Sequence, residues 1–496
     1  MTDIVMKKQH AIIWILIVLF CIQSGYSQNQ AVWRNGDFNC FSILVGKGAT
    51  VDGSVLFAHN EDDFGKQLVN WYIKEAEVHH EGEELELKNG GRTAQVEKTA
   101  KMLWLEIPGM DFSDSYLNEH GVCIASNSCP SREKDPDLTN GGIGYRLRGL
   151  MAERATSARE AVQIGGALIE QFGYTGSGRS YCIADADEAW VMAAVRGKHW
   201  VAQRVPDNSV MILPNNYTIE EVDLEDKENF LACKDLIEYA IEKEWYNPSS
   251  DGAFNFRKAY AAENSLSHPG NTSRAWGAYH MFNMPYAIDD SFPFSFVPKE
   301  KVSKEMLMET LAFHYEGTEL DKSKNYTLGS PYEMNGSMIC GKASVYGFVT
   351  QCRSWLPVEI GTVMWLAPQW PDIQPFIPWY SGMTRMPDGF AKKGYLNDLS
   401  EHYNPPEDIH ERYGGHAFWS FVELSDWVNE DYGGRIKKLR KSKHKIEKKL
   451  LRRQHRTEKL MTRMHKGNPD ALKEYLNDFT AVWAEITWNL AEKNKK

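Results

Sequence analysis

Long apolar runs are scarce in this chain. The run at residues 11–22 holds about a dozen residues, whereas a bilayer-spanning helix needs about 20. Lys7 and Lys8 precede it, and small residues flank a cut after Ser27, which is typical of a secretory signal peptide. No later segment is long and apolar enough to cross a membrane. We therefore expect residues 1–27 to be removed and the mature chain to be periplasmic or secreted.

An excess of positive charge is also missing. The 496 residues carry a net charge of −11, which argues against a nucleic-acid partner. The charge is uneven, because residues 435–466 hold 15 Lys or Arg and two Glu, a net +13, and the rest of the chain carries −24. The apolar residues of this segment fall roughly on one side of a helix. We expect this basic helix to pack on the acidic body; the alternative is a weak contact with an anionic membrane or envelope polymer.

The cysteines are too few and too widely spaced to form a structural zinc site. Cys123 and Cys129 are too far apart for a Cys-x2–4-Cys pair, and no second pair accompanies them. Seven cysteines remain once the signal peptide is lost, so one is left over if the other six pair. Cys40 is the expected odd thiol. Cys340 with Cys352 is the most local pairing, although the sequence alone fixes none.

The composition, 42% hydrophobic and 25% charged, is that of a globular protein with a large core. Strands are predicted at residues 41–46, 54–59, 122–126, 181–184, 189–195, 200–205, 210–213, 344–350 and 361–366. Helices are predicted at residues 157–172, 417–428 and 435–464. The first of these opens with a capping box from Ser157 to Glu160 and closes at Gly173. Strands with interspersed helices favour a layered α+β domain.

The most informative run extends from Cys40 to Asp62 and reads CFSILVGKGATVDGSVLFAHNED. Cys40 follows the export signal by about a dozen polar-rich residues. Trimming of residues 28–39 would leave one residue with a thiol nucleophile and a free α-amine. This amine has a reference pKa of about 7.7 to 8.0 and is a base near neutral pH, attached to its own nucleophile.

This run resembles the opening of the N-terminal nucleophile cysteine dipeptidases, which include the secernin-like proteins and are related to conjugated bile salt hydrolases and penicillin V acylases. Further likeness is found at residues 117–122, 153–155, 158–162, 184–185, 188–191, 199–207, 361–365 and 376–382. The resemblance covers Cys40 to about residue 390. It implies a four-layer αββα sandwich, with two antiparallel sheets between helices. It also implies an exported dipeptidase that acts on small peptides through a thioester and needs no metal or organic cofactor.

The resemblance also implies roles for the residues of this run. It places the nucleophile at Cys40 and the family's carboxylate at Asp62, where it would accept a hydrogen bond from the new α-ammonium. The related acylases have an arginine three residues before this carboxylate, where this chain has His59. We assign His59 and Asn60 to substrate binding; the alternative for His59 is a polar residue at a strand end.

Three more residues receive roles from the same resemblance. Asn127 matches the acylase asparagine whose amide helps to bind the oxyanion. Asn215 matches a second asparagine near the nucleophile and is preferred over its neighbour Asn216. Arg274 matches the arginine that supports the cysteine and its charge network.

The domain division follows from these observations. Pro405-Pro406 and Gly414-Gly415 indicate a boundary after the composition shift that follows Tyr380. We expect a signal peptide at residues 1–27, a prosegment at 28–39, a catalytic domain at 40–400 and a C-terminal helical extension at 401–496.

Three other functions are considered. The 15 histidines would allow a conventional Cys-His-Asn protease, but that mechanism does not explain why Cys40 follows a short prosegment. An acylase of the bile-salt or penicillin type would share the machinery and differ in its substrate pocket. A non-enzymatic envelope-binding protein would use the basic helix. We expect a small peptide as substrate and a homo-oligomer; no residue stands out as the partner of a dipeptide's free ammonium or carboxylate.

Overall fold

The computed structural model describes residues 40–63, 69–106, 113–391, 407–408, 411 and 414–495. The predicted signal peptide and prosegment, and most of the predicted boundary near residue 400, lie outside these ranges. The chain from Asn39 to Lys496 belongs to one compact unit. None of the helices in the described ranges combines the length and the apolar character that a membrane span requires.

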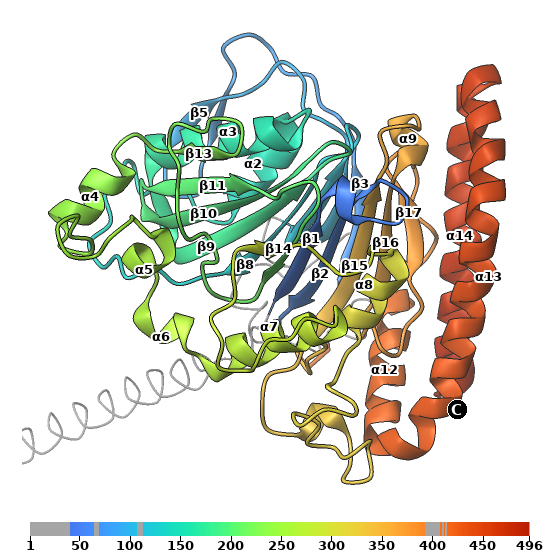
Figure 1. Ribbon diagram of the computed structural model, residues 1–496. Helices are drawn as coiled ribbons and strands as arrows, with labels where there is room; N and C mark the ends of the chain where they lie inside the picture. The colour runs from blue at the N-terminus through green and yellow to red at the C-terminus, as the bar shows by residue number, and fades with distance from the viewer. Residues whose placement is uncertain are drawn as a thin grey trace, which may run out of the picture. The chain divides into compact units, whose positions relative to one another are not determined.

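Two antiparallel sheets form the body of this unit (Figure 1). The first has the order β14-β12-β1-β2-β15-β16-β17. Its strands are β1 (Phe41–Val45), β2 (Val55–Asp62), β12 (Val210–Leu213), β14 (Ser295–Phe296), β15 (Ser344–Cys352), β16 (Thr362–Pro368) and β17 (Ile377–Tyr380). All the strands predicted for this sheet are present.

The second sheet has the order β13-β11-β10-β9-β8-β7-β6-β3. Its strands are β3 (Asn70–Lys74), β6 (Met102–Glu106), β7 (Ser115–Asn118), β8 (Cys123–Ser128), β9 (Tyr174–Ala184), β10 (Ala189–Gly197), β11 (Trp200–Arg204) and β13 (Phe230–Ala232). A separate pair joins β4 (Glu84–Glu86) to β5 (Arg92–Ala94). The four strands predicted for the second sheet are confirmed, whereas β3, β6, β7 and β13 were not predicted.

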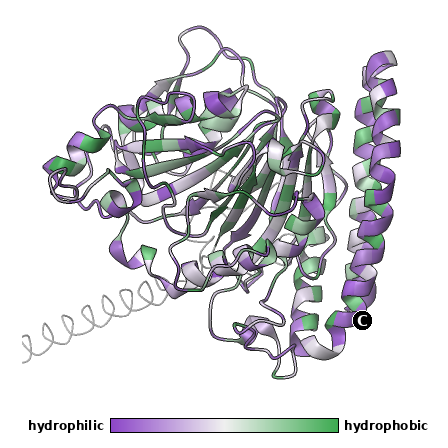
Figure 2. Cartoon of the chain, in the orientation of Figure 1, coloured by the Kyte–Doolittle hydropathy of each residue, from purple (hydrophilic) through white to green (hydrophobic). Residues whose placement is uncertain are grey.

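The two sheets pack against each other through their central strands. β1 contacts β8 and β9, and β2 contacts β9. Every residue of β1 and β2 is buried, and Figure 2 shows hydrophobic residues along the strands inside the body. A strand buried on both faces has no need of a polar side, which explains why β1 is apolar except for Ser42.

Helices cover both sheets. α2 (Arg146–Arg154) and α3 (Ala158–Phe172) contact the second sheet, whereas α7 (Pro269–Met281) and α8 (Lys304–Leu311) contact the first. The predicted cap of α3 is confirmed, because Ser157 accepts a hydrogen bond from the backbone N–H of Glu160 and Gly173 ends the helix at φ 79°. The short helices are α4 (Leu236–Glu242), α5 (Phe256–Tyr260), α6 (Glu263–Leu266), α9 (Val358–Gly361) and the 3-10 turns Lys47–Ala49 and Pro331–Glu333.

The C-terminal helices pack on the edge of the first sheet. These are α12 (Ala417–Glu430), α13 (Tyr432–Gly467) and α14 (Pro469–Asn494), of which α14 was not predicted. α14 contacts β17, α12 and α13. The predicted packing of the basic helix on the body is confirmed, because the guanidinium of Arg353 donates to both carboxylate oxygens of Glu458 on α13, at 2.6 and 2.7 Å. Leu460, predicted to lie on the apolar side of α13, is instead 44% exposed.

The pairing of six cysteines that the sequence left open does not occur in the described residues. All seven cysteines of the described residues are free and buried. Cys340 and Cys352 cannot pair, because the nine-residue strand β15 separates them. At about 3.3 Å per residue, this strand alone holds its two ends more than about 25 Å apart, far beyond the reach of a disulfide.

Candidate active site

Cys40 lies immediately before β1, at the open end of the β1–β2 hairpin. The register pairs Phe41 with Asn60 and Ser42 with His59, so one step further brings Cys40 opposite Glu61. The Sγ atom lies 3.3 Å from Oε1 of Glu61 and 3.8 Å from the backbone oxygen of Asp62. The Cys40 thiol is therefore a buried group in direct contact with a carboxyl group.

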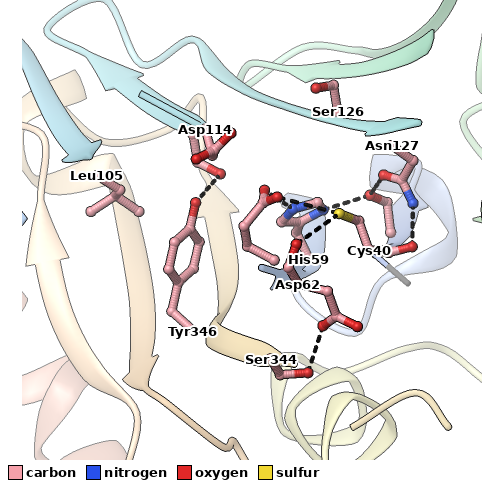
Figure 3. Close-up of polar contacts among 12 residues, drawn as sticks. Cys40, His59, Asp62, Leu105, Asp114, Ser126, Asn127, Ser344 and Tyr346 are labelled. Carbon is pink, nitrogen blue, oxygen red and sulfur yellow. Dashed lines mark hydrogen bonds and ion pairs between the residues drawn. The ribbon is translucent and has the colours of Figure 1, made fainter. Parts of the chain in front are cut away.

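A continuous set of hydrogen bonds connects the two sides of Cys40 (Figure 3). Nε2 of His59 lies 2.9 Å from Oε2 of Glu61, and Nδ1 of His59 lies 2.7 Å from Oγ of Ser42. Ser42 donates to Oδ1 of Asn127 at 2.7 Å, and Nδ2 of Asn127 donates to the carbonyl oxygen of Cys40 at 2.7 Å. We call these five residues the Cys40 network.

The geometry of Asn127 does not fit the predicted oxyanion role. Its Nδ2 also donates to the carbonyl oxygens of Leu213, at 3.0 Å, and Pro214, at 3.2 Å. An amide nitrogen has two hydrogens, and both are already directed at backbone oxygens. In this arrangement Asn127 positions the backbone of Cys40 and offers no free donor to a substrate.

Arg274 and Asn215 lie beside Cys40, as expected. Nη1 of Arg274 donates to the carbonyl oxygen of Cys40 at 3.0 Å, and Nη2 donates to Oδ1 of Asn215 at 2.9 Å. Nη2 also donates to Asn271, a residue that the sequence did not indicate. Asn216 instead lines a cavity of about 590 Å³ on the other flank of this segment, so the preference for Asn215 agrees with the geometry.

The expected contacts of β2 residues with substrate require correction. Asn60 is completely buried, and its amide donates to the backbone oxygens of Leu311 and Ile339. His59 is also completely buried, with both ring nitrogens engaged in the Cys40 network. Neither side chain has a surface for substrate, because a strand in the middle of this sheet is covered on both faces.

Asp62 occupies the position expected for the carboxylate near the nucleophile. Its backbone oxygen faces the Cys40 sulfur, and Oδ1 accepts a hydrogen bond from Oγ of Ser344 at 2.6 Å. Ser344 begins β15, so this contact ties the end of β2 to the next strand.

Burial controls the protonation of this site. Burial raises the pKa of the Cys40 thiol well above its usual range, and the charges of Glu61 and Asp62 raise this pKa further. Burial also raises the pKa of Glu61 to about 7, against the effect of Arg148. The pKa of His59 falls to about 3, because burial and the charge of Arg148 both disfavour the imidazolium. At neutral pH the thiol is protonated and His59 is neutral.

Glu61 is the important residue that the sequence analysis missed. It stands within the run that identified Cys40, between two residues that were given roles. Only the hairpin register could have singled it out, because that register decides which residue of β2 faces Cys40. Arg148 of α2 was also missed; it is fully buried and binds Oδ1 of Asp114 at 2.6 Å.

A cavity of about 440 Å³ lies along α7. Its wall includes Gly270 and Ser273, which precede Arg274 on the helix, and Ser337 and Met338. Its volume is within the range of small-molecule sites. It therefore offers room for a small ligand next to the helix that holds the Cys40 carbonyl.

Two other clusters combine side chains that can bind metals. His199, Cys233 and Asp235 form one, and His314, Cys340 and Asp372 form the other. Neither includes a residue of the Cys40 network. In the second cluster, Asp372 is already held by the hydroxyl groups of two tyrosines.

Comparison with known families identifies the chain. The model of peptidase family C69 matches residues 39–443, which is most of the chain, so the protein belongs to this family. It is accordingly a hydrolase that acts on peptide bonds. The matched range begins one residue before Cys40.

Similar proteins include several curated relatives. A probable dipeptidase of Salmonella dublin is 27% identical over 369 residues, which cover 71% of this chain and 83% of the relative. A probable dipeptidase of Latilactobacillus sakei is 27% identical over 409 residues, or 79% and 82% of the two chains. Among solved structures, a variant of conjugated bile acid hydrolase from Clostridium perfringens aligns with 66% of this chain and 89% of its own, at 12% identity and a TM-score of 0.32.

Proposed function

We propose that this protein is an exported cysteine dipeptidase that cleaves the peptide bond of small peptides with Cys40 as its N-terminal nucleophile. The main support is the position of Cys40 at the head of β1, where Arg274 and Asn127 hold its carbonyl oxygen and Glu61 contacts its thiol. The family match that begins at residue 39 and the dipeptidase names of the relatives also support it.

In the proposed mechanism, removal of residues 1–39 converts the amide nitrogen of Cys40 into an α-amine. The amine takes the thiol proton, directly or through a water molecule, and the thiolate attacks the carbonyl carbon of the substrate. The new ammonium protonates the leaving amine, which departs and leaves a thioester on Sγ. Water then hydrolyses the thioester and restores the thiol.

Asn215 is our candidate for the side-chain donor to the oxyanion. Its Oδ1 is fixed by Arg274, and its Nδ2 donates to the carbonyl oxygen of Ser128 at 3.0 Å. This leaves one hydrogen of Nδ2 without a partner among the described residues. A donor aimed at the developing negative charge is typically worth about 3 to 4 kcal/mol.

Asp62 is our candidate for the partner of the new α-ammonium. Its carboxylate is oriented by Ser344, and its backbone lies against the Cys40 sulfur. A carboxylate fixed beside the amine would hold the nitrogen in line with the thiol, as the family resemblance implies.

Several wider features belong to the same proposal. We infer a four-layer αββα sandwich over residues 40–400 and a helical extension over residues 401–496. The contacts of α2 and α3 with one sheet, and of α7 and α8 with the other, support the sandwich. We also propose export to the periplasm or the medium and a homo-oligomeric assembly. The exposed basic face of α13 would allow a weak contact with an anionic surface.

The N-terminal residue of the active protein tests the nucleophile. Intact-mass measurement is expected to give a chain that begins at Cys40, and Cys40→Ala should have no activity. Cys40→Ser should retain little, because a hydroxyl is much harder to ionise than a thiol. A fully active chain that begins at Gln28 would contradict the amine-base mechanism, whereas an inactive chain with that terminus would favour the non-enzymatic binding protein.

A substrate panel tests the dipeptidase assignment. The mature enzyme should release amino acids from unblocked dipeptides without added metal, resist chelators and lose activity on thiol alkylation. An N-blocked dipeptide should react more slowly if a buried carboxylate pairs with the free ammonium. Activity confined to conjugated bile acids or penicillin V would replace the dipeptidase by an acylase with the same nucleophile.

A further inference from the structure

The proposed mechanism leaves the first proton transfer in the precursor unexplained. Before residues 1–39 are removed, the nitrogen of Cys40 belongs to a peptide bond and is no base. The thiol in this state is protonated, because burial and two nearby carboxylates raise its pKa. If Cys40 cuts the bond on its own amino side, another group has to accept the thiol proton.

Glu61 is in position to do so. Its Oε1 lies 3.3 Å from Sγ, and the other hydrogen-bond partner of Sγ in the described part of the chain is the backbone oxygen of Asp62. A backbone carbonyl is not a useful base. The Asp62 carboxylate is directed at Ser344 instead.

The hydrogen-bond directions in the Cys40 network determine where the protons lie. Asn127 donates from Nδ2, so its Oδ1 accepts the single hydrogen of Ser42. The Ser42 oxygen must then accept a hydrogen from Nδ1 of His59. Neutral His59 therefore presents a lone pair at Nε2, 2.9 Å from Oε2 of Glu61. In the protonated form of Glu61 the proton therefore lies on that oxygen, where His59 can take it.

We propose that Glu61 is a catalytic base for the maturation of the precursor, and that His59 acts as its proton partner. Glu61 takes the thiol proton at Oε1 while its Oε2 proton moves to Nε2 of His59. The inference rests on the proposed function, because it assumes that Cys40 becomes the N-terminus. It gives His59, which stands where related acylases have arginine, a role in the precursor.

The bond changes are balanced. The thiolate of Cys40 attacks the carbonyl carbon of Asn39, and the C–N bond between the two residues breaks as a C–S bond forms. Glu61 returns a proton to the departing nitrogen, which becomes the α-amine, as His59 returns its own proton to Glu61. Water hydrolyses the resulting thioester, which frees the carboxyl group of Asn39 and the thiol of Cys40. No oxidant, reductant or cofactor takes part.

The surroundings of Glu61 predict a pH dependence. The charged groups that face it are Arg148 of α2, Arg179 of β9, and Asp63. Both arginines lower the pKa of Glu61, and Asp63 raises it. Burial has the largest effect and brings this pKa to about 7. Asp114 and the Tyr346 hydroxyl of β15 also face this carboxyl group. Below about pH 7 Glu61 is protonated and has to pass its Oε2 proton to His59 before it can accept another. Above about pH 7 the ionised carboxylate accepts the thiol proton directly, so maturation should accelerate as the pH rises through about 7.

The test follows the precursor directly. The full 496-residue chain would be made by cell-free synthesis, and the appearance of a species that begins at Cys40 would be timed by intact mass between pH 5.5 and 8.5. Glu61→Gln keeps the size and the polar contacts but cannot take the proton; it should mature at least 100-fold more slowly and without the rise near pH 7. Glu84→Gln, on the exposed strand β4, is the matched control and should mature normally.

Cleavage of the precursor by an added protease shows whether Glu61 acts as a base or only supports the structure. Residues 1–39 would be replaced by a tag that an added protease removes to leave Cys40 first, since residues 39–496 form their own compact unit. The bypassed Glu61→Gln chain should regain dipeptide turnover that its uncut precursor lacks, because the α-amine is then the base. Loss of both maturation and bypassed turnover would overturn the proposal in favour of a structural role.

The remaining outcomes are distinct. Normal maturation of the Glu61→Gln precursor to a Cys40 terminus would overturn the role of Glu61 and leave the proposed function intact. A wild-type enzyme that is active with a different N-terminus would refute the proposed function itself.

Discussion

At the scale of single residues, Asn127 joins the two sheets beside Cys40. It belongs to β8 of the second sheet, and its amide binds the backbone oxygens of Cys40, Leu213 and Pro214 next to strands of the first. Its side chain is completely buried. A buried amide with all of its hydrogen bonds made stabilises one arrangement of the surrounding backbone.

Substitution should therefore separate Asn127 from Asn215. Asn127→Ala should lower the free energy of unfolding by about 1 to 3 kcal/mol or more, because buried backbone oxygens lose their donor. Asn215→Ala should lose less stability, because Asn271 still accepts a hydrogen bond from Arg274. It should lose about 100- to 1000-fold in kcat, with a smaller change in KM, since the oxyanion charge develops only during reaction. Urea denaturation and steady-state kinetics on the mature enzyme measure both.

The opposite result would support the predicted role of Asn127 in binding the oxyanion. If Asn127→Ala has parental stability and a specific loss of kcat, its amide must turn toward the substrate in the mature enzyme.

At the scale of secondary-structure elements, α13 is held by polar contacts as well as by its apolar side. Arg353 follows β15 and forms a two-point contact with Glu458, and both side chains are at least nine-tenths buried. The Tyr380 hydroxyl of β17 also donates to Glu458. Arg353 thus balances the charge of Glu458 on the face of α13 that packs against the sheet. Most basic residues of α13 are exposed instead.

Removal of one partner should loosen the helix. Glu458→Ala leaves Arg353 buried without a carboxylate, which typically costs about 3 to 5 kcal/mol. The matched control is Glu474→Ala, since Glu474 meets Arg385 with both side chains more than half exposed and such pairs contribute about 1 kcal/mol or less. Equal denaturation midpoints for the two variants would show that the apolar contacts alone hold α13.

At the scale of the whole molecule, the described part of the chain is stabilised by its core and contains no disulfide. The buried apolar residues form one continuous cluster that includes both sheets and the C-terminal helices. A chain of this size can bury enough surface to fold without covalent links, so free cysteines behave here as small apolar residues.

Thiol titration checks this point. The mature chain denatured under nitrogen without reductant should give seven thiols, and the unfolding midpoint of the native protein should be unchanged by added reductant. A value of one thiol would show that the other six cysteines form three disulfides, the pairing that the odd number of cysteines allowed.

The sequence by itself determined the buried strands, the α3 cap and the basic helix, and it singled out Cys40 as the residue to examine. These are local properties: a continuous apolar run, a capping box or an unusual cysteine can be recognised within a few residues of chain. Cys40, Asn215 and Arg274 were correctly expected to lie together, because the family resemblance carried that information across a long separation in sequence.

Only the tertiary structure decided which side chains surround Cys40. The hairpin register places Glu61 opposite Cys40, and a shift of one residue would exchange the faces of every side chain on β2. Packing of one sheet on the other turned Asn127 toward backbone oxygens and enclosed His59. Burial then moved the pKa of Glu61 to about 7, because desolvation depends on all the elements packed around a group.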